Sequence, residues 1–227
     1  MKKWILPLFC LFQIHLFAQD STKVRLNPLR NGGIFGSVEY SVLRLDYAPF
    51  VLDTLGTMGR ISVKNGVSLS AGIFYKKKIA NWLIIRPALG ASFSTGRLAY
   101  DLNKLREVYY DIHPLTANLQ LHFMIPAGYL RNRMPEPDVI RGFTPIIGPS
   151  VFIPVEQIPT IHPEVKNYDV HLDFGFGYQW ENKQMKSHID MIYSLGLVNL
   201  IGVKDDVYTN PVQSLYRDSF SIRYYFH

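Results

Sequence analysis

Histidine and aspartate alternate in two nearby segments, and these side chains are the first candidates for chemistry. Asp169, His171 and Asp173 are spaced by two residues, and His188 and Asp190 repeat the spacing shortly afterwards. Side chains two residues apart share a face when the backbone is extended. Such a set contains the groups needed for a metal site or for a general base with an orienting carboxylate.

The same groups also suit a network of charges that fills a protein interior, and we favour that interpretation. Buried charges need opposite charges beside them, and the chain supplies arginines that can pair with these carboxylates. The predicted interior set is Glu39, Arg86, Gln120, His122, Asp169, His171, Asp173, His188, Asp190, Arg217 and Arg223. We expect this set to be structural, with no catalytic, cofactor-binding or metal-binding residue and no cofactor.

Other motifs give little support for catalysis. Ser187 and His188 are adjacent, so an extended backbone places them on opposite faces. The chain has no G-x-S-x-G, H-E-x-x-H or P-loop pattern. A lipid-modifying acyl hydrolase or transferase, built on the His and Asp residues above, stays open as an alternative to a non-enzymatic protein.

Eight segments alternate apolar and polar residues, as half-buried strands do. In the clearest one, Val170, Leu172 and Phe174 face one way while His171 and Asp173 face the other. The segments are 34–42, 67–75, 83–94, 115–125, 143–155, 168–180, 188–198 and 216–226. Each has about the length that a tilted strand needs to cross a bilayer.

The residue types on the two faces indicate which face is inside. The polar faces are rich in Ser, Gly, Asn and Gln, which suit the narrow interior of a small barrel. The lysines beyond the first twenty residues lie at segment ends or in connections, which keeps charge out of hydrocarbon. The fold class predicted is all-β: an eight-stranded antiparallel up-and-down transmembrane β-barrel with a polar, side-chain-filled lumen. A soluble lipocalin-like barrel is the alternative.

The first residues have the pattern of a secretory signal. Lys2 and Lys3 precede the mostly apolar stretch 4–17, and Ala18 stands at the expected cleavage position. We therefore expect 1–18 to be removed and 19–227 to form the barrel domain. Cleavage also removes Cys10, the only cysteine, which excludes disulfides and thiolate chemistry in the rest of the chain. The formal charge of +6 is too diffuse for a nucleic-acid surface.

The connections predict an orientation for the barrel. Residues 76–81 and 181–186 are expected to be short periplasmic turns, and 46–62, 99–110, 156–166 and 200–214 longer outer loops. The connection 126–142 is long for the periplasmic side and is either a floppy turn or a docking element. Basic residues near the outer rim are candidates for contact with lipopolysaccharide phosphates: Arg60, Arg97, Lys104, Arg106, Lys166 and Lys204.

Two features fit this scheme poorly. Pro145 and Pro149 both lack an amide hydrogen, so we expect a bulge or weakened pairing along 143–155. Asp218 falls on the nominal lipid face, either at the outer interface or because the register is misassigned.

Several stretches together resemble the PorT family of small outer-membrane barrels from Bacteroidetes. They include the signal ending at Ala18-Gln19 and the segments 89–93, 147–150, 168–177, 193–200, 208–217 and 220–222. The run Gly196-Leu197-Val198-Asn199-Leu200 is the most specific of them. The chain departs from the usual barrel-assembly signal because His227 follows Phe226.

The resemblance implies an outer-membrane location and a role in type IX protein secretion and, in gliding species, motility. It also implies envelope proteins of the secretion system as partners, besides outer-membrane lipid and lipopolysaccharide, and no nucleic acid. With an even number of strands, both termini are expected in the periplasm. A structural or adhesive barrel that acts through its extracellular loops is a further alternative.

Overall fold

The computed structural model describes residues 31–47, 61–102, 106–126, 142–155, 165–182, 185–202 and 212–226. The predicted signal segment 1–18 and most of the connection 126–142 lie outside these residues. Within the described part of the chain, no helix has the length and apolar character needed to cross a membrane.

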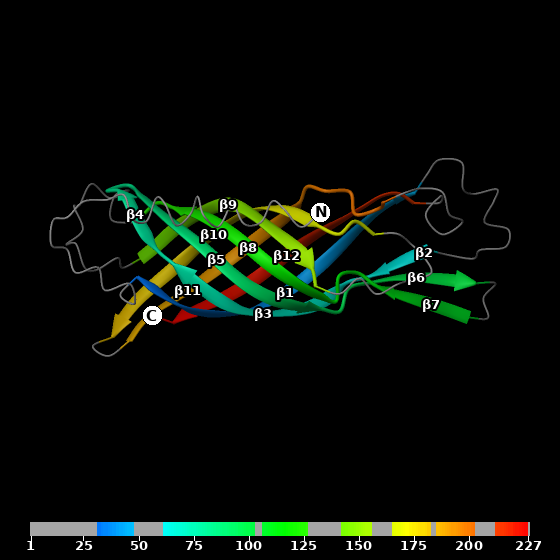
Figure 1. Ribbon diagram of the computed structural model, residues 1–227, viewed down its shortest axis with the longest axis horizontal. Coiled ribbons are helices and arrows are strands. Elements are labelled where there is room, and N and C mark those ends of the chain that lie inside the picture. The colour runs from blue at the N-terminus through cyan, green and yellow to red at the C-terminus, as the bar shows by residue number, and fades with distance from the viewer. Residues whose placement is uncertain are drawn as a thin grey trace, which may run out of the picture.

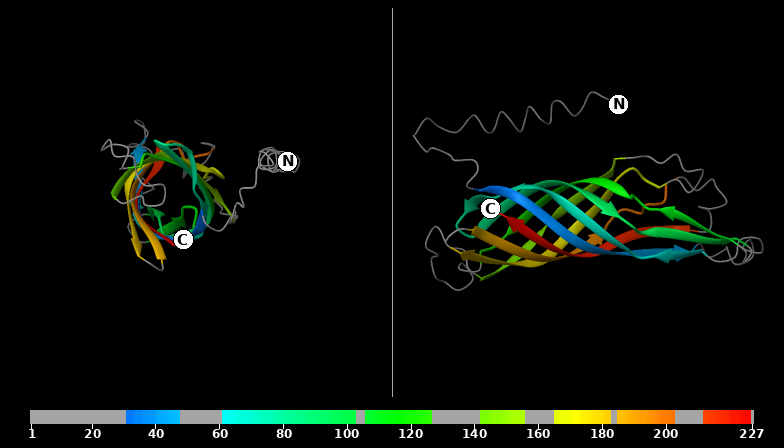
Figure 2. Two further views of the ribbon diagram at one scale, coloured as in Figure 1. Left: turned by 90° about the vertical axis from the view of Figure 1, so that its left-hand side faces the viewer. Right: turned by 90° about the horizontal axis from the view of Figure 1, so that it is seen from below.

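Antiparallel strands close into a barrel, as predicted. The barrel strands are β1 (Gly32–Tyr47), β3 (Gly66–Tyr75), β5 (Leu83–Ser94), β8 (Leu115–Met124), β9 (Gly142–Pro154), β10 (Asp169–Asn182), β11 (Met185–Gly196) and β12 (Val212–Phe226). Each pairs with its neighbours in the order β3-β1-β12-β11-β10-β9-β8-β5, and the β3–β5 pairing closes the ring. Figure 1 shows the tilted strands from the side, and Figure 2 shows the closed ring from one end.

Alternation along each strand sorts side chains between the interior and the outer surface. In β1, Ile34, Val38 and Tyr40 are about half exposed, whereas Ser37 and Glu39 are buried. Because successive side chains of a strand point to opposite faces, one face of every strand lies against the lumen. The small and polar residues occupy that face, so the predicted assignment of inside and outside is confirmed.

The barrel has two distinct ends. Ile34 of β1 pairs with Phe226 of β12, so the first and last strands start and finish at the same end, which we call the terminal end. The opposite end, where β2, β6 and β7 project beyond the barrel, we call the loop end. The pairing of β10 with β11 reaches the terminal end at Asn182 and Met185, and residues 81–82 form a short turn at the same end.

The predicted turn at 76–81 is wrong because the chain stays extended through most of it. Strand β4 (Lys77–Ala80) continues β3 and pairs with β5, with Lys77 opposite Ile85. The two pairings share one register, since Phe74 lies opposite Ala88. The ladder is interrupted opposite Pro87, which has no amide hydrogen to donate. One long hairpin therefore replaces the expected short one, and the turn itself is at 81–82.

The predicted outer loops 46–62 and 99–110 are also wrong in part. They contribute to a three-stranded sheet of β2 (Ile61–Lys64), β6 (Arg97–Leu102) and β7 (Arg106–Asp111), in the order β2-β6-β7. Leu98 and Tyr100 of β6 are fully buried and pack in an apolar cluster with Ile61. These strands are too short for alternation to distinguish them from loops, and they form because the cluster buries one face of the sheet.

The two prolines of β9 weaken one ladder but produce no bulge. The pairing of β9 with β10 runs without a shift from Phe152 to Gly142. The ladder between β8 and β9 is interrupted from Gln120–Ser150 to Phe123–Ile147, and Pro149 lies in the gap. The register is the same on both sides of the gap. Of the two alternatives expected, a bulge or weakened pairing, the structure shows the weakened pairing.

Candidate functional site

The structure places the whole predicted interior set inside the barrel. Every member is buried, with an exposed fraction of 5% or less: Glu39, Arg86, Gln120, His122, Asp169, His171, Asp173, His188, Asp190, Arg217 and Arg223. They come from β1, β5, β8, β10, β11 and β12, and they fall into groups that touch one another. The question is therefore what these contacts allow chemically.

The first group joins β5 to β11 around the Asp190 carboxylate. Arg86 forms an ion pair with one carboxylate oxygen and His188 contacts the other. Arg86 also stacks on the Tyr225 ring, with its guanidinium carbon 4.1 Å from the ring centroid. The side chains of Arg86 and Asp190 have no exposed surface. A charge pair so fully removed from water holds the two strands together but is closed to any substrate.

Gly177 of β10 makes this group possible. A Cβ placed on Gly177 would lie 2.3 Å from His188 Nε2 and 2.4 Å from Asp190 Oδ1. No side chain fits at that distance, so the absence of a Cβ creates the space for the imidazole and the carboxylate. The glycine thus positions the pair from a neighbouring strand.

A second group continues from the first through His122 of β8. Arg86 Nη2 lies 3.2 Å from His122 Nδ1, and His122 Nε2 lies 2.8 Å from Asp173 Oδ2. Arginine is only a donor, so the Nδ1 atom accepts and the proton of a neutral imidazole resides on Nε2, facing the carboxylate. Ser150 donates to the other oxygen of Asp173 at 2.9 Å. The imidazole bridges an arginine and an aspartate.

Arg223 extends the network across the lumen. Its Nη1 donates to Gln120 Oε1 at 2.7 Å, and its Nε donates to Ser221 Oγ at 3.1 Å. Its Nη2 lies 3.8 Å from Asp173 Oδ2. On β1, the strand next to β12, Ser41 donates to Glu39 at 3.5 Å. Among the described contacts, Asp190, Asp169 and Asp173 each lie beside an arginine as predicted, whereas Glu39 does not.

A third group lies nearer the loop end. Asp169 Oδ2 is 2.7 Å from His171 Nε2 and 3.0 Å from Arg217 Nε. None of these atoms has a well-directed hydrogen bond, so the group is held by the proximity of opposite charges rather than by aligned donors. The Phe152 ring packs against both side chains that face Asp169, 4.8 Å from the His171 ring and 4.9 Å from the Arg217 guanidinium.

His113 connects the loop end to the barrel, and no pattern in the sequence predicted this role. It lies between β7 and β8 with a φ of 50°, a left-handed conformation that histidine adopts more readily than most residues. Its Nε2 donates to the Lys166 carbonyl at 2.7 Å. Burial and the nearby Arg217 charge lower the pKa of His113 to about 4. The neutral imidazole of His113 therefore links the β7–β8 connection to the segment before β10.

Apolar clusters lie at both ends of the charged interior. Leu43, Leu98, Leu200 and Leu215 belong to a fully buried cluster at the loop end, where it joins the β2-β6-β7 sheet to the barrel. Towards the terminal end lie two smaller clusters. They comprise Phe35, Phe74, Ala88 and Tyr225 in one, and Ile84, Met124 and Ile146 in the other. The charges are thus enclosed between apolar side chains.

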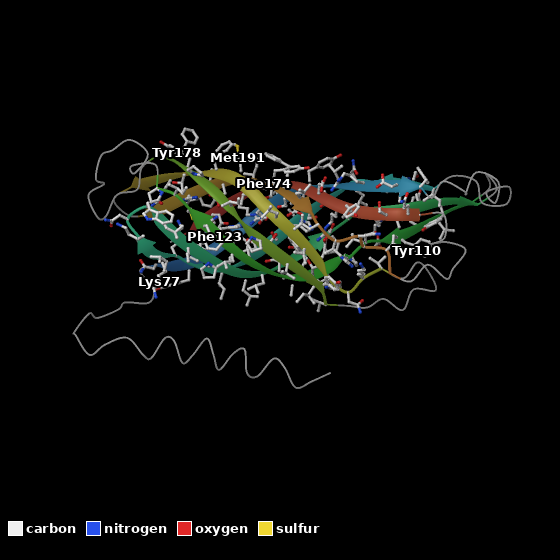
Figure 3. The ribbon with its side chains drawn as sticks, turned by 90° about the horizontal axis from the view of Figure 1, so that it is seen from above. Lys77, Tyr110, Phe123, Phe174, Tyr178 and Met191 are labelled. Carbon is white, nitrogen blue, oxygen red and sulfur yellow. The ribbon has the colours of Figure 1, made fainter. Side chains whose placement is uncertain are left out.

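The exterior is that of a membrane-spanning barrel. Large apolar side chains cover it, among them Leu69, Leu89 and Leu119, each more than half exposed. Figure 3 shows Tyr178 and Met191 pointing away from the barrel, and Lys77 and Tyr110 near its opposite ends. A continuous apolar surface of this size is incompatible with water and matches the hydrocarbon of a bilayer. Closed barrels with this exterior span outer membranes.

The nominal misfit Asp218 has a structural explanation. It lies on the outward face of β12, opposite Val42 of β1, with no error of register. Arg44 Nε lies 2.6 Å from Asp218 Oδ2. The predicted strand 34–42 ended before Arg44, so its outward position next to Asp218 was missed. The sequence alternation continues beyond residue 42 through Leu43, Arg44 and Leu45, and following it would have placed Arg44 on the same face as Val42.

The structure describes the side chains that the sequence offered for catalysis and for metal binding. Ser187 and His188 face opposite sides, and the Ser187 hydroxyl accepts a hydrogen bond from Tyr224 at 2.8 Å. Among the residues that the structure describes, no group of three or more His, Cys, Asp or Glu side chains is arranged to hold a metal ion. The interior groups are mutually paired and closed to solvent.

Of the basic residues predicted at the outer rim, the structure describes the side chains of Arg97 and Lys166. Arg97 Nε pairs with Asp111 at 2.5 Å, and both side chains are exposed. Lys166 is half-buried. The side chains of Arg60, Lys104, Arg106 and Lys204 lie outside the described part.

Among solved structures, the chain is similar to an outer membrane protein. No family model matches the chain, and no curated protein matches it. The crystal structure of the outer membrane protein OprG from Pseudomonas aeruginosa is 14% identical, with a TM-score of 0.42, and the match covers 87% of this chain and 93% of that one.

Proposed function

We propose that this protein is a non-enzymatic, non-conducting barrel of the outer membrane that serves protein secretion as an accessory or assembly component. The observation that carries the proposal is the interior. Its charged side chains are buried, its three arginines lie beside carboxylates, and apolar clusters enclose them towards both ends. Eight strands leave an interior that side chains just fill. The surfaces left for function are the two ends.

The connections support a periplasmic terminal end. Outer-membrane barrels have short turns on the periplasmic side and longer loops outside. The turn at 81–82 and the Asn182–Met185 end of the β10–β11 pairing lie at the terminal end, and the β2-β6-β7 sheet lies at the other. Both termini of the barrel domain then lie in the periplasm, where they are available to other envelope proteins.

The secretion role rests on the resemblance to the PorT family. That resemblance implies type IX secretion and, in gliding species, motility, with other secretion-system proteins as partners. It agrees with a barrel that neither conducts nor reacts, because such a barrel acts by binding. Outer-membrane lipid and lipopolysaccharide surround it.

Deletion of the gene tests the secretion role. We expect the deleted strain to lose secreted cargo from the culture medium, as measured by proteomics of the supernatant, and to regain it from a plasmid copy. Unchanged secretion would contradict the role. The lipid A of the same strain should keep its mass spectrum, and an altered spectrum would instead favour the lipid-modifying alternative.

Planar bilayers test the closed interior. The purified, folded barrel should give no stepwise current at moderate voltage, because charged groups and apolar clusters fill the lumen. A porin of known conductance serves as the control for bilayer quality. Regular channels from the wild-type protein would contradict the proposal.

A second candidate is adhesion through the loop end, favoured by the β2-β6-β7 sheet. The sheet projects beyond the barrel and presents Tyr109, which is 43% exposed and hydrogen-bonded to Lys64 at 2.8 Å. A binding assay with intact cells, comparing the wild type with a chain lacking 97–111, distinguishes the two functions. Lost cell adhesion with normal secretion would favour this candidate.

A further inference from the structure

Three charged side chains point outward from the barrel strands, among those whose side chains the structure describes. They are Arg44 and Asp46 of β1 and Asp218 of β12. All three lie towards the loop end of their strands. The rest of the described outward face of these strands is free of charge. A charged side chain at this position therefore needs an ion-pair partner or a polar ligand.

Asp218 is the buried member of this group of three charged residues. Its carboxylate accepts Arg44 Nη2 at 3.0 Å, the Gly196 amide at 2.9 Å and the Tyr193 hydroxyl at 3.2 Å. Its side chain is only 6% exposed, whereas that of Arg44 is 47% exposed. The pair therefore buries its anion and presents its cation to the surroundings.

Arg44 is held in one orientation and keeps N–H groups that can donate to a further acceptor. Asp218 occupies its Nε and Nη2 atoms, and the Tyr216 ring lies 5.2 Å from the guanidinium carbon. A guanidinium carries five N–H groups, so those of Nη1 remain for another acceptor. Asp46 lies farther towards the loop end and accepts a hydrogen bond from Ser214 at 2.6 Å. The donors suit the oxygen atoms of a phosphate.

The depth of Arg44 matches that of lipid headgroups. Ten residues separate Ile34 from Arg44 along β1. At about 3.3 Å per residue and a tilt of about 40°, this distance spans roughly 25 Å, the height of the apolar band in outer-membrane barrels. If Ile34 lies at the inner edge of the hydrocarbon, Arg44 lies at its outer edge, at the level of the phosphate groups.

We propose that Arg44, oriented by Asp218, binds the phosphate group of a lipid in the outer leaflet. This inference rests on the proposed membrane orientation and assigns a position to the expected contact with lipopolysaccharide. The site lies on the barrel wall, on β1 and β12, rather than among the basic residues of the outer rim. One lipid bound there would fix the height of the barrel in the membrane.

Native mass spectrometry of the full folded barrel with added lipid A tests the proposal. The wild type should retain one lipid A more tightly than Arg44→Gln by about tenfold in apparent affinity, since the lost contact is a charge-assisted hydrogen bond. Lys77→Gln is the matched control, because it removes an exposed cation at the terminal end of the barrel and should bind like the wild type. Arg44→Lys keeps the charge without the fork of donors and should bind with intermediate affinity.

Two outcomes would overturn the proposal. Equal retention by the wild type and Arg44→Gln would show that the pair is structural only. Displacement of lipid A by millimolar inorganic phosphate would show a site for free phosphate. Heat-dependent gel mobility reports separately whether each variant folds into bilayers, so failure of the membrane location is distinguishable from failure of this site. If Arg44→Gln does not fold, equal retention by the wild type and Arg44→Lys contradicts the proposal.

Discussion

The Asp190 carboxylate shows how a buried charge depends on its partners. It contacts Arg86 and His188, and none of these three side chains is more than 1% exposed. Replacement of one member leaves the others charged or polar in a medium that cannot solvate them. The network is therefore most sensitive to changes that remove a single partner.

We predict that Asp190→Asn lowers the free energy of unfolding by about 3–5 kcal/mol, because Arg86 would keep a buried, uncompensated charge. Urea unfolding in detergent, followed by tryptophan fluorescence, measures the change. Asp111→Asn is the control, since its pair with Arg97 is exposed and should be worth less than about 1 kcal/mol. Similar losses in the two variants would contradict the structural role of the network.

Gly177 offers a second test at the same place. A methyl group there would collide with His188 and Asp190. We predict that Gly177→Ala costs about 1–3 kcal/mol of stability, the usual cost of overpacking. Gly36→Ala is the matched control, because the nearest atom to its added Cβ is Ser70 O at 4.0 Å. The same unfolding assay applies, and equal stability of the two variants would count against the close packing.

At the level of strands, alternation predicted the barrel because each barrel strand separates lipid from a polar interior. The interior set followed from the same alternation. The hairpin formed by β4 and β5 was not predicted. Three consecutive lysines, Lys76, Lys77 and Lys78, are typical of an exposed turn, although the backbone stays extended there. The β2-β6-β7 sheet was not predicted because its strands are too short to show an alternation of apolar and polar residues. Its apolar cluster also includes residues that are distant in the sequence, such as Leu200.

Leu98 tests whether the β2-β6-β7 sheet depends on its cluster. We predict that Leu98→Ala costs about 2–5 kcal/mol locally, since the side chain is fully buried. Limited proteolysis should then cut within 97–111, while the barrel keeps its heat-dependent gel mobility. Loss of the barrel itself would show that the sheet and the barrel fold as one unit.

The connection held by His113 should respond to acid. Its pKa is lowered to about 4 in the folded protein, so the unfolded state binds a proton first as the pH falls below about 6.5. The contribution of His113 to stability is therefore fully present above that pH and decreases down to about pH 4.

Hydrogen exchange at 112–115 should accelerate as the pH falls from 6.5 to 4, after correction for the intrinsic pH dependence of exchange. His113→Asn is the control, because asparagine tolerates a left-handed φ but does not titrate. The variant should show no such acceleration. The same acceleration in both proteins would assign the effect to other groups.

For the whole molecule, the apolar band defines the bilayer that the barrel prefers. A band of roughly 25 Å favours thin membranes. We predict a higher folded fraction in dilauroyl than in dioleoyl phosphatidylcholine vesicles, measured by gel mobility. Asp218→Leu, which removes a charge from the outer edge of the band, should reduce this preference. A higher yield in the thicker bilayer would contradict the assignment of the band.

The distribution of charge among the strands bears on assembly. Strands β10, β11 and β12 supply Asp169, Asp173, Asp190, Arg217 and Arg223, and their partners include residues of β5 and β8. Until β5 and β8 have joined, Asp190 lacks its Arg86 counterion and Asp173 lacks its His122 partner, so these carboxylates would enter hydrocarbon only partly paired. Stepwise insertion of single hairpins is thus disfavoured, and the protein needs a route into the membrane that admits all of its strands together.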